Sequence, residues 1–175
     1  CWLPDDGLQR KEELDRVPYL AWRAAGYLDT TPGRAVSKLQ VALKLAQLAE
    51  HFEIQSVAFD RWRIEDFKAL AADNGVELPP MEPFGQGYQS MSPALEAMET
   101  HLLNGTVEHP AHPILTWCAA NAVVVSDAAE NRKLSKDKAT GRIDLMVAAV
   151  MGAGLVAKQQ PEANLNDFIY EPLIG

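Results

Sequence analysis

The sequence has few cysteines, no long apolar run and no excess of positive charge. Its two cysteines, Cys1 and Cys118, are too few for a disulfide framework, and no CxxC pair or Cys/His cluster with zinc spacing occurs. This excludes disulfide-rich and zinc-finger proteins and indicates an intracellular, reduced protein. The most apolar segment, residues 145–157, is shorter than the roughly 18 to 20 residues of a membrane-spanning helix, so we expect no membrane insertion.

Motifs of several enzyme classes are also absent. The sequence contains no phosphate-binding loop of the GxxxxGKS or GxxxxGKT type and no GxSxG nucleophile motif. Residues 85–87 (Gly-Gln-Gly) lack the third glycine of a dinucleotide-binding fingerprint. A proline follows each of His109 and His112, which prevents a regular helix from bringing the two imidazoles together as metal ligands. A small-molecule enzyme with an α/β fold therefore has no motif in its support.

The charge balance is acidic. A net charge of -8 and an isoelectric point near 5.0 argue against a protein that coats nucleic acid by bulk electrostatics. Residues 126–144 form the most basic stretch of the chain. Its basic residues are Arg132, Lys133, Lys136, Lys138 and Arg142, and its acidic residues are Asp127, Glu130, Asp137 and Asp144. Composition alone favours a solvated loop there, although a local basic patch could still bind phosphate.

Length and residue pattern indicate one α/β domain. With 175 residues, of which 47% are hydrophobic, the chain can form a single domain with its own core over residues 1–175. Residues 1–17 are polar and contain proline and glycine, so we expect an irregular arm there, with one helical turn around residues 9–14 as an alternative for that part of it. Residues 158–175 are expected to form an irregular tail. Helices are expected at 19–25, 36–52, 64–74, 92–104, 114–122 and 142–157, and extended segments at 27–31, 54–59, 79–84, 106–108, 123–126 and 132–134. This alternation predicts an α/β fold in which helices cover a sheet.

Two aspartates stand out from their surroundings. Asp60 directly follows the apolar run 54–59, so we expect it at the carboxyl end of a buried strand, where open α/β sheets bind ligands. Its alternative role is to cap the helix that follows, which is the commoner use of Asp in this position. Asp144 is an isolated charge near the N-terminus of an apolar helix. If it were buried it would need a partner or a metal, whereas an exposed carboxylate would interact favourably with the helix dipole.

Two carboxylates on neighbouring elements suggest divalent-metal-dependent cleavage of phosphodiesters. Mg²⁺ and Mn²⁺ prefer hard oxygen ligands, and two ions about 3.5 to 4 Å apart can stabilise both the attacking and the leaving oxygen. Such sites normally need three or more carboxylates. Asp60 and Asp144 would therefore form only part of such a metal site.

Four segments carry a resemblance to a known family. They are residues 58–62 (AFDRW), 84–93 (FGQGYQSMSP), 117–124 (WCAANAVV) and 135–144 (SKDKATGRID). In this order they resemble the nuclease region of phage terminase large subunits. The resemblance covers most of the chain, from Trp2 to the helix around Val150.

The resemblance implies an RNase H-like nuclease fold, with a mixed sheet covered by helices, that cuts concatemeric double-stranded DNA during phage or prophage genome packaging. It matches Asp60 to the second acidic position, and Asp144 to the last, of a catalytic cluster that binds Mg²⁺ or Mn²⁺. Lys136, Lys138 and Arg142 precede the last position and become candidate contacts to DNA phosphate. The implied partners are DNA and, in the full-length protein, the portal and the small terminase subunit, in the cytoplasm of a bacterial host.

The chain departs from the family at its start. In the family, another metal-binding Asp lies on the first strand of the domain, upstream of the segment that matches Trp2, and an ATPase motor precedes it. Because this chain begins after both, we expect an N-terminally truncated fold, an incomplete metal site with weak or no cleavage, and self-association through an uncovered sheet edge. The alternative function is a non-catalytic remnant that binds other packaging proteins through its acidic surface.

Overall fold

The protein is a mixed α/β molecule, described here from a computed structural model over residues 1–60 and 64–159. In chain order the elements are β1 (Trp2–Pro4), α1 (Leu8–Asp15), α2 (Tyr19–Ala24), β2 (Asp29–Thr31), α3 (Lys38–His51), β3 (Val57–Phe59), α4 (Ile64–Asp73), β4 (Met81–Pro83), α5 (Tyr88–Leu103), α6 (Pro113–Asn121), β5 (Val124–Ser126), β6 (Arg132–Leu134) and α7 (Asp144–Gln159). Helices α2 to α7 and the β5–β6 hairpin overlap the ranges predicted from the sequence, which confirms the α/β class.

Most of the first 17 residues form regular structure, so the prediction of an irregular arm is wrong, whereas the helical turn expected at residues 9–14 falls within α1. β1 pairs in parallel with β2, and α1 runs for 8 residues. The residues that flank α1, Gly7 and Arg16, have φ values of 79° and 53°, which turn the chain at both ends of the helix. Leu8 is the one buried residue of α1, so the segment has no apolar period that would show the full length of the helix.

Two other sequence predictions need correction. Residues 106–108 form no strand, and the backbone N–H of Thr106 instead donates to the carbonyl of His101 at the end of α5. Lys158 and Gln159, expected in an irregular tail, are the last residues of α7. The remainder of that tail, residues 160–175, lies outside the described residues.

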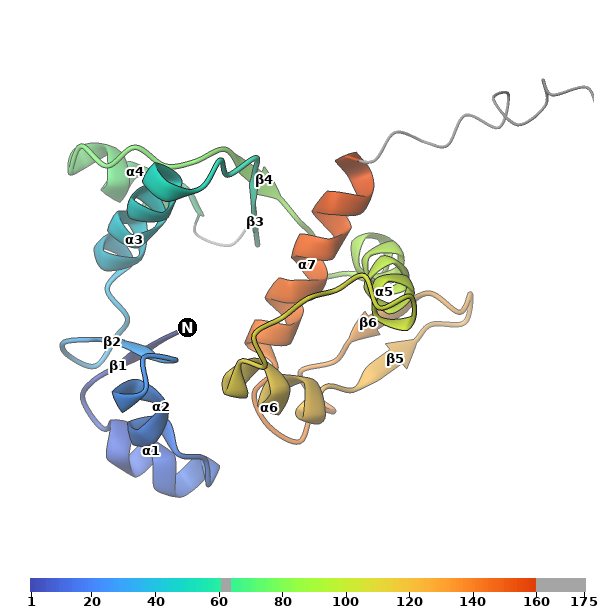
Figure 1. Cartoon of the computed structure of the whole chain (residues 1–175), viewed down its shortest axis with the longest axis horizontal. Helices are drawn as coiled ribbons and strands as arrows, with labels where there is room; N and C mark the ends of the chain where they lie inside the picture. The colour runs from blue at the N-terminus through green and yellow to red at the C-terminus, as the bar shows by residue number, and fades with distance from the viewer. Residues whose placement is uncertain (61–63, 160–175) are drawn as a thin grey trace, which may run out of the picture.

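The strands form three separate pairs. β1–β2 and β3–β4 are parallel and β5–β6 is antiparallel, so the single mixed sheet expected from the sequence is not found within residues 1–60 and 64–159. Each strand is three residues long and pairs along one edge. Figure 1 shows the three pairs at separate places around α7. Helices, rather than a continuous sheet, therefore hold this part of the molecule together.

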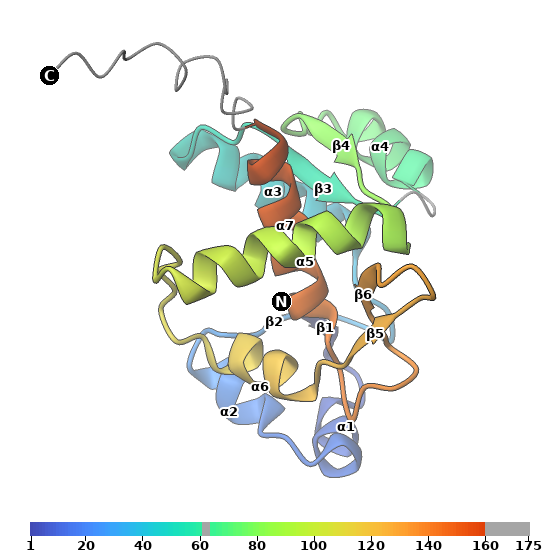
Figure 2. The same ribbon diagram turned by 90° about the vertical axis from the view of Figure 1, so that its right-hand side faces the viewer.

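Helix α7 connects the two hydrophobic clusters of the core. One cluster includes Phe84, Leu95 and Val150 and joins α7 to α5 and β6, while the other includes Tyr19 and Ile114 and joins the first turn of α7 to α1, α2 and α6. Figure 2 shows α5 crossing α7 near the middle of the molecule. Helix α7 therefore packs against elements from both the beginning and the end of the chain.

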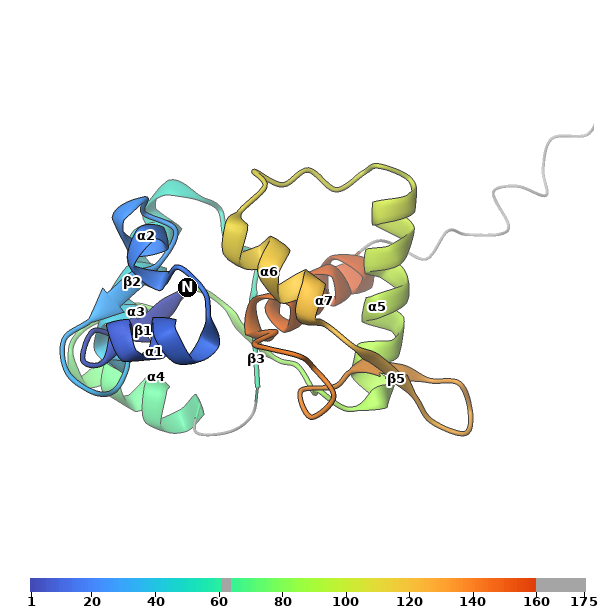
Figure 3. The same cartoon turned by 90° about the horizontal axis from the view of Figure 1, so that it is seen from below.

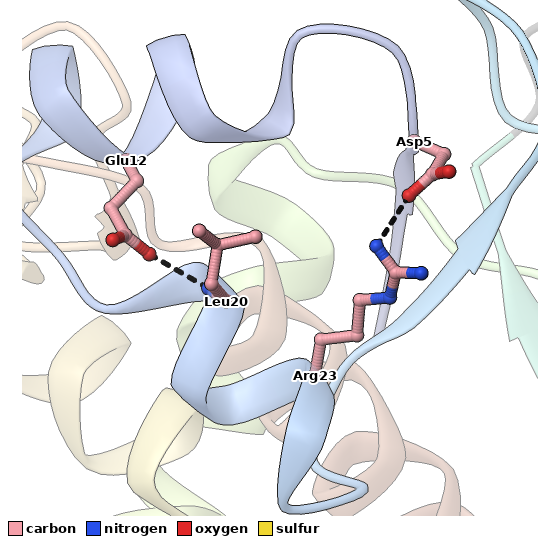
Figure 4. Close-up of polar contacts among 4 residues, drawn as sticks. All are labelled: Asp5, Glu12, Leu20 and Arg23. Atoms are coloured by element: carbon pink, nitrogen blue, oxygen red, sulfur yellow. Dashed lines mark hydrogen bonds and ion pairs between the residues drawn. The ribbon is translucent and has the colours of Figure 1, made fainter.

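Charged side chains connect α2 to α1 and to the turn that precedes α1. The carboxylate of Glu12 accepts a hydrogen bond from the backbone N–H of Leu20 at 2.7 Å, and the guanidinium of Arg23 lies 2.6 Å from the carboxylate of Asp5 (Figure 4). Leu20 is in the first turn of α2, where backbone N–H groups lack partners within the helix and favour negative charge. Glu12 thus acts as a cap for α2 from a neighbouring helix.

The helix α3, predicted to cover a sheet, packs against α4 instead. Its N-terminus is capped by Ser37, whose hydroxyl accepts from the backbone N–H of Gln40, and Leu43 remains half exposed. Seen from below in Figure 3, the β5–β6 hairpin reaches past α7 and α5.

Among the described residues, no helix has both the length and the apolar content that crossing a membrane requires.

Candidate metal and nucleic-acid site

Asp60 lies at the carboxyl end of strand β3, as the sequence predicts. The strand is half buried, and Ala58 packs against the core cluster around α7, while Asp60 itself is exposed. Its carboxylate accepts a hydrogen bond of 2.9 Å from the side-chain amide of Gln86. Because β3 and β4 are parallel, their carboxyl ends lie at the same edge, which brings the loop after β4 and its Gln86 to Asp60.

The capping alternative for Asp60 concerns the start of α4. That helix begins at Ile64 and is preceded by residues 61–63, which lie outside the described residues. The contact found for the side chain is with Gln86, on the chain segment after β4. This glutamine was not identified from the sequence, because no local pattern links it to a residue 26 positions earlier.

Asp144 is the first residue of α7. Its side chain is 69% exposed, and its carboxylate lies 2.8 Å from the ammonium of Lys136 in the loop before the helix. Because the Asp144 side chain is exposed, it needs no metal to compensate for burial of its charge. Its position at the N-terminus of α7 is consistent with a favourable interaction with the helix dipole. An exposed ion pair of this kind contributes about 0–1 kcal/mol, so Lys136 can leave the carboxylate at little cost.

The two aspartates lie on adjacent elements. Figures 1 and 2 show β3 and α7 side by side and running in opposite directions, and residues 54–58 line a shallow cavity together with the later turns of α7. The end of β3 from which Asp60 follows therefore faces the half of α7 that begins at Asp144. Each carboxylate is held by a different donor, Gln86 or Lys136.

The donor chemistry of this region suits a hard divalent cation, although its carboxylates are few. Mg²⁺ commonly takes one or two protein carboxylates and completes its shell with water and substrate phosphate oxygens. Asp60 and Asp144 are two exposed carboxylates on adjacent elements, each paired with a donor from the protein. Within the described part of the chain, no group of three or more His, Cys, Asp or Glu residues is arranged to hold a metal ion.

The other predicted site residues occupy different surroundings. Lys136 contacts Asp144, whereas Arg142 donates from Nε to the carboxylate of Asp15 at 3.1 Å. Lys138 is exposed, and its backbone N–H donates to the hydroxyl of Ser135. The structure therefore brings one of the three basic residues directly to a predicted metal ligand and ties another to α1.

Asp15 connects Arg142 to the aromatic side of the core. It accepts hydrogen bonds from the hydroxyl of Tyr19 at 2.7 Å and from Arg142. Burial opposes the ionisation of Asp15, but these hydrogen bonds outweigh it and lower the pKa of the carboxyl. Burial of Tyr19, together with its hydrogen bond to the charged Asp15, raises the pKa of its hydroxyl to about 12. Asp15 was not identified from the sequence because 127 positions separate it from Arg142.

Comparison with known proteins places the chain in a family. The family model for "Terminase large subunit, endonuclease domain" matches residues 1–160. The large terminase subunit of Enterobacteria phage HK97 is 47% identical over 174 residues, which cover 98% of this chain and 34% of that protein. Protein YmfN of Escherichia coli K12 is 28% identical over 130 residues, covering 62% of this chain and 29% of that protein.

A solved structure gives the same result. The crystal structure of the HK97 bacteriophage large terminase matches with a TM-score of 0.83 and 49% identity, over 88% of this chain and 32% of that one. The chain thus spans about a third of the length of the relatives it matches. These matches confirm the resemblance on which the sequence predictions rest: the chain belongs to the endonuclease-domain family of terminase large subunits.

Proposed function

We propose that the chain is the metal-dependent endonuclease domain of a phage or prophage terminase large subunit and cuts concatemeric double-stranded DNA during genome packaging. Asp60 and Asp144 are its metal-binding and catalytic carboxylates. The observation that carries this proposal is their position on adjacent, oppositely directed elements, each exposed and each held by a polar side chain. Membership of the terminase family gives that arrangement its chemical meaning.

The residues divide the task between them. Gln86 orients the carboxylate of Asp60, and Lys136, on leaving Asp144, becomes available to a DNA phosphate together with Lys138 and Arg142. Mg²⁺ or Mn²⁺, when bound by the two aspartates, supplies the positive charge that activates water and stabilises the phosphodiester under attack. The protein's remaining contribution is to hold the DNA backbone over these carboxylates.

The wider assignment follows from the family. We assign the chain an RNase H-like nuclease fold, DNA as its substrate, and the portal and the small terminase subunit as partners of the full-length protein, acting in the cytoplasm of the bacterial host. Self-association through an uncovered strand edge belongs to the same proposal, since β1–β2 and β3–β4 are each pairs of short strands.

Plasmid cleavage and Mn²⁺ binding test the proposal together. Because the site is expected to be incomplete, we expect the chain to nick plasmid DNA only weakly in Mn²⁺ and not at all in EDTA. We expect Asp60→Asn and Asp144→Asn each to weaken Mn²⁺ binding and to lower that cleavage at least about a hundredfold, a loss of roughly 2.7 kcal/mol. If either variant cleaves like the parent chain, its aspartate has no catalytic role. Cleavage in EDTA would show that the reaction does not require a divalent metal ion.

Two observations favour a second function. Among the described residues there is no three-ligand group for a metal, and the chain carries a net charge of -8, so it could serve as a non-catalytic module that binds other packaging proteins through an acidic surface. A chain that neither cleaves DNA nor binds Mn²⁺, yet binds the portal or the motor in a salt-dependent manner, would establish this function in place of the first.

A further inference from the structure

Strand β6 places Lys133 beside the start of α5. Its two neighbours on the strand face α5 and the core: the guanidinium of Arg132 lies 2.9 Å from the carboxylate of Glu99, and Leu134 is buried. Lys133 points to the other face of the strand, where its ammonium lies 4.8 Å from the centre of the Tyr88 ring. Figure 2 shows the β5–β6 hairpin next to the end of α5 that begins with Tyr88.

The same end of α5 carries the contact to Asp60. Gln86, whose amide donates to the Asp60 carboxylate at 2.9 Å, stands two residues before Tyr88. The Cα atoms of Gln86 and Tyr88 are therefore within about 7 Å of each other, because the backbone limits the reach of two residues to this length. A short series of contacts thus links Asp60 to Lys133 through the first residues of α5.

The positive charge of Lys133 is not compensated by a carboxylate. Three nearby cations of the chain are each paired: Arg132 with Glu99, Lys136 with Asp144, and Arg142 with Asp15. Within residues 1–60 and 64–159, no carboxylate lies at ion-pair distance from Lys133, and its Nζ is not a buried atom. An aromatic ring attracts a cation without neutralising it, so the ammonium of Lys133 can bind an anion that approaches from solvent.

The strand that carries Lys133 is held firmly in place. Arg132 donates from its guanidinium to Glu99, and its backbone N–H donates to the hydroxyl of Ser92 at 3.1 Å, so both contacts attach β6 to α5. Paired guanidinium and carboxylate groups of this kind fix orientation as well as distance. Lys133 is therefore presented from a fixed backbone, and the Tyr88 ring restricts its long side chain.

We propose that Lys133, positioned by Tyr88, binds a DNA phosphate on the Asp60 side of the cleavage site. The inference rests on the proposed function, whose basic contacts all lie in the loop before α7, on the Asp144 side. A DNA strand that crosses both aspartates carries phosphates beyond each of them, and Lys133 binds one at the end where Gln86 meets Asp60. Restriction of the lysine side chain before binding lowers the entropy cost of that contact.

Duplex binding at several salt concentrations tests the phosphate contact. Fluorescence anisotropy with a short DNA duplex, in EDTA so that no cleavage occurs, gives the slope of log K against log salt. We expect Lys133→Ala to weaken duplex binding and to reduce the magnitude of that slope by about 0.9, the value for one lost phosphate contact. Lys133→Arg keeps the charge and should keep the slope. Lys44→Ala, which removes the same charge from an exposed position on α3, is the matched control and should leave the slope unchanged.

Two variants of Tyr88 test its positioning role. Tyr88→Phe keeps a ring beneath the ammonium and should bind the duplex like the parent chain. Tyr88→Leu removes the ring and should weaken duplex binding roughly two- to fivefold, which corresponds to the usual strength of an exposed contact between a cation and a ring. The same change should have no further effect in a chain that already carries Lys133→Ala. An equal loss in both backgrounds would show that Tyr88 does not act through Lys133.

The remaining outcomes separate this contact from the nuclease assignment. Equal slopes for the parent chain and Lys133→Ala, an equal loss with Lys44→Ala, or no duplex binding at low salt would each overturn the proposal. If it is overturned while Asp60→Asn still lowers Mn²⁺-dependent cleavage, the nuclease assignment stands and the Lys133 contact is wrong. If Lys133→Ala reduces the slope while both aspartate variants cleave like the parent, the DNA contact stands and the catalytic assignment is wrong.

Discussion

At the scale of single residues, Gln86 is the side chain on which the proposed site most directly depends. It donates to Asp60 at 2.9 Å and so fixes which oxygen of that carboxylate remains available to a metal. Gln86→Leu keeps a similar size and removes the donor. Loss of a partner outside the ligand shell commonly lowers metal affinity 10- to 100-fold, and because Asp60 is exposed we expect about a tenfold weaker Kd for Mn²⁺, measured by the paramagnetic resonance of free Mn²⁺.

The control for this prediction is an exposed glutamine elsewhere in the chain. Gln55 donates to the backbone carbonyl of Glu53 at the opposite end of the same strand region, so Gln55→Leu should leave the Mn²⁺ Kd unchanged. Both variants should keep the Tm of the parent chain, because the two amides are on the surface. A Gln86→Leu chain that binds Mn²⁺ like the parent would show that this hydrogen bond does not position the ligand.

At the scale of elements, the crossing of α5 and α7 depends on Gly154. A Cβ at this position would come within 2.7 Å of both the Ala94 Cβ and the Phe84 ring. Overpacking of a core costs about 1–3 kcal/mol, which exceeds the roughly 1 kcal/mol that alanine gains over glycine in a helix. We therefore expect Gly154→Ala to lower the free energy of unfolding by up to about 2 kcal/mol, measured by urea denaturation.

Gly152 provides the matched comparison on the same helix. A Cβ there meets nothing within 4 Å, so Gly152→Ala should stabilise the chain by up to about 1 kcal/mol through helix propensity alone. The two alanine variants are thus expected to have opposite signs. If Gly154→Ala stabilises the chain as much as Gly152→Ala does, the two helices are free to move apart and the crossing is not tightly packed.

The elements also show how far the sequence could predict this fold. Helix α5 follows from apolar residues at helical spacing, and the structure buries two of them, Met91 and Leu95. Gly75 directly follows the helix predicted at residues 64–74 and has a φ of 65°, a backbone angle that residues other than glycine rarely adopt. Local patterns of this kind give the position of a helix. They do not give the pairing of strands, because β1 meets β2 through contacts 27 positions apart that no local period records.

The candidate site was predictable to a similar extent. Asp60 and Asp144 could be identified because each is an isolated charge beside an apolar element, and the resemblance to the terminase family gave them a role. Gln86 and Asp15 could not be identified in this way, since their contacts with Asp60 and Arg142 span 26 and 127 positions. The residues that contact the candidate site come from distant segments, whereas the two aspartates proposed for its chemistry each leave a local signal.

At the scale of the whole molecule, Asp15, Tyr19 and Arg142 join the N-terminal helices to the loop that precedes α7. Their pKa shifts make this junction sensitive to pH in two windows. The pKa of Asp15 is lowered from 3.8 in the folded state, so its contribution to stability is present above that value and is lost as the pH falls through the folded pKa. The pKa of Tyr19 is raised from 10.0 to about 12, so its contribution is complete below pH 10.0 and is lost as the pH rises toward 12.

The variant Tyr19→Phe tests the contribution of the Tyr19 hydroxyl to stability at alkaline pH. The variant lacks the hydroxyl that donates to Asp15, and loss of a hydrogen bond to a charged group costs roughly 1–3 kcal/mol at neutral pH. Between pH 10.0 and about 12 the unfolded parent chain ionises Tyr19 before the folded chain does, so the stability difference between parent and variant should shrink steadily, measured by urea denaturation at each pH. Tyr27→Phe, at a tyrosine that is 41% exposed, is the control and should show no such convergence. A difference between the parent and Tyr19→Phe that stays constant across this window would mean that the Tyr19 hydroxyl is as free to ionise in the folded chain as in the unfolded one, and that the junction is held by Arg142 and Asp15 alone.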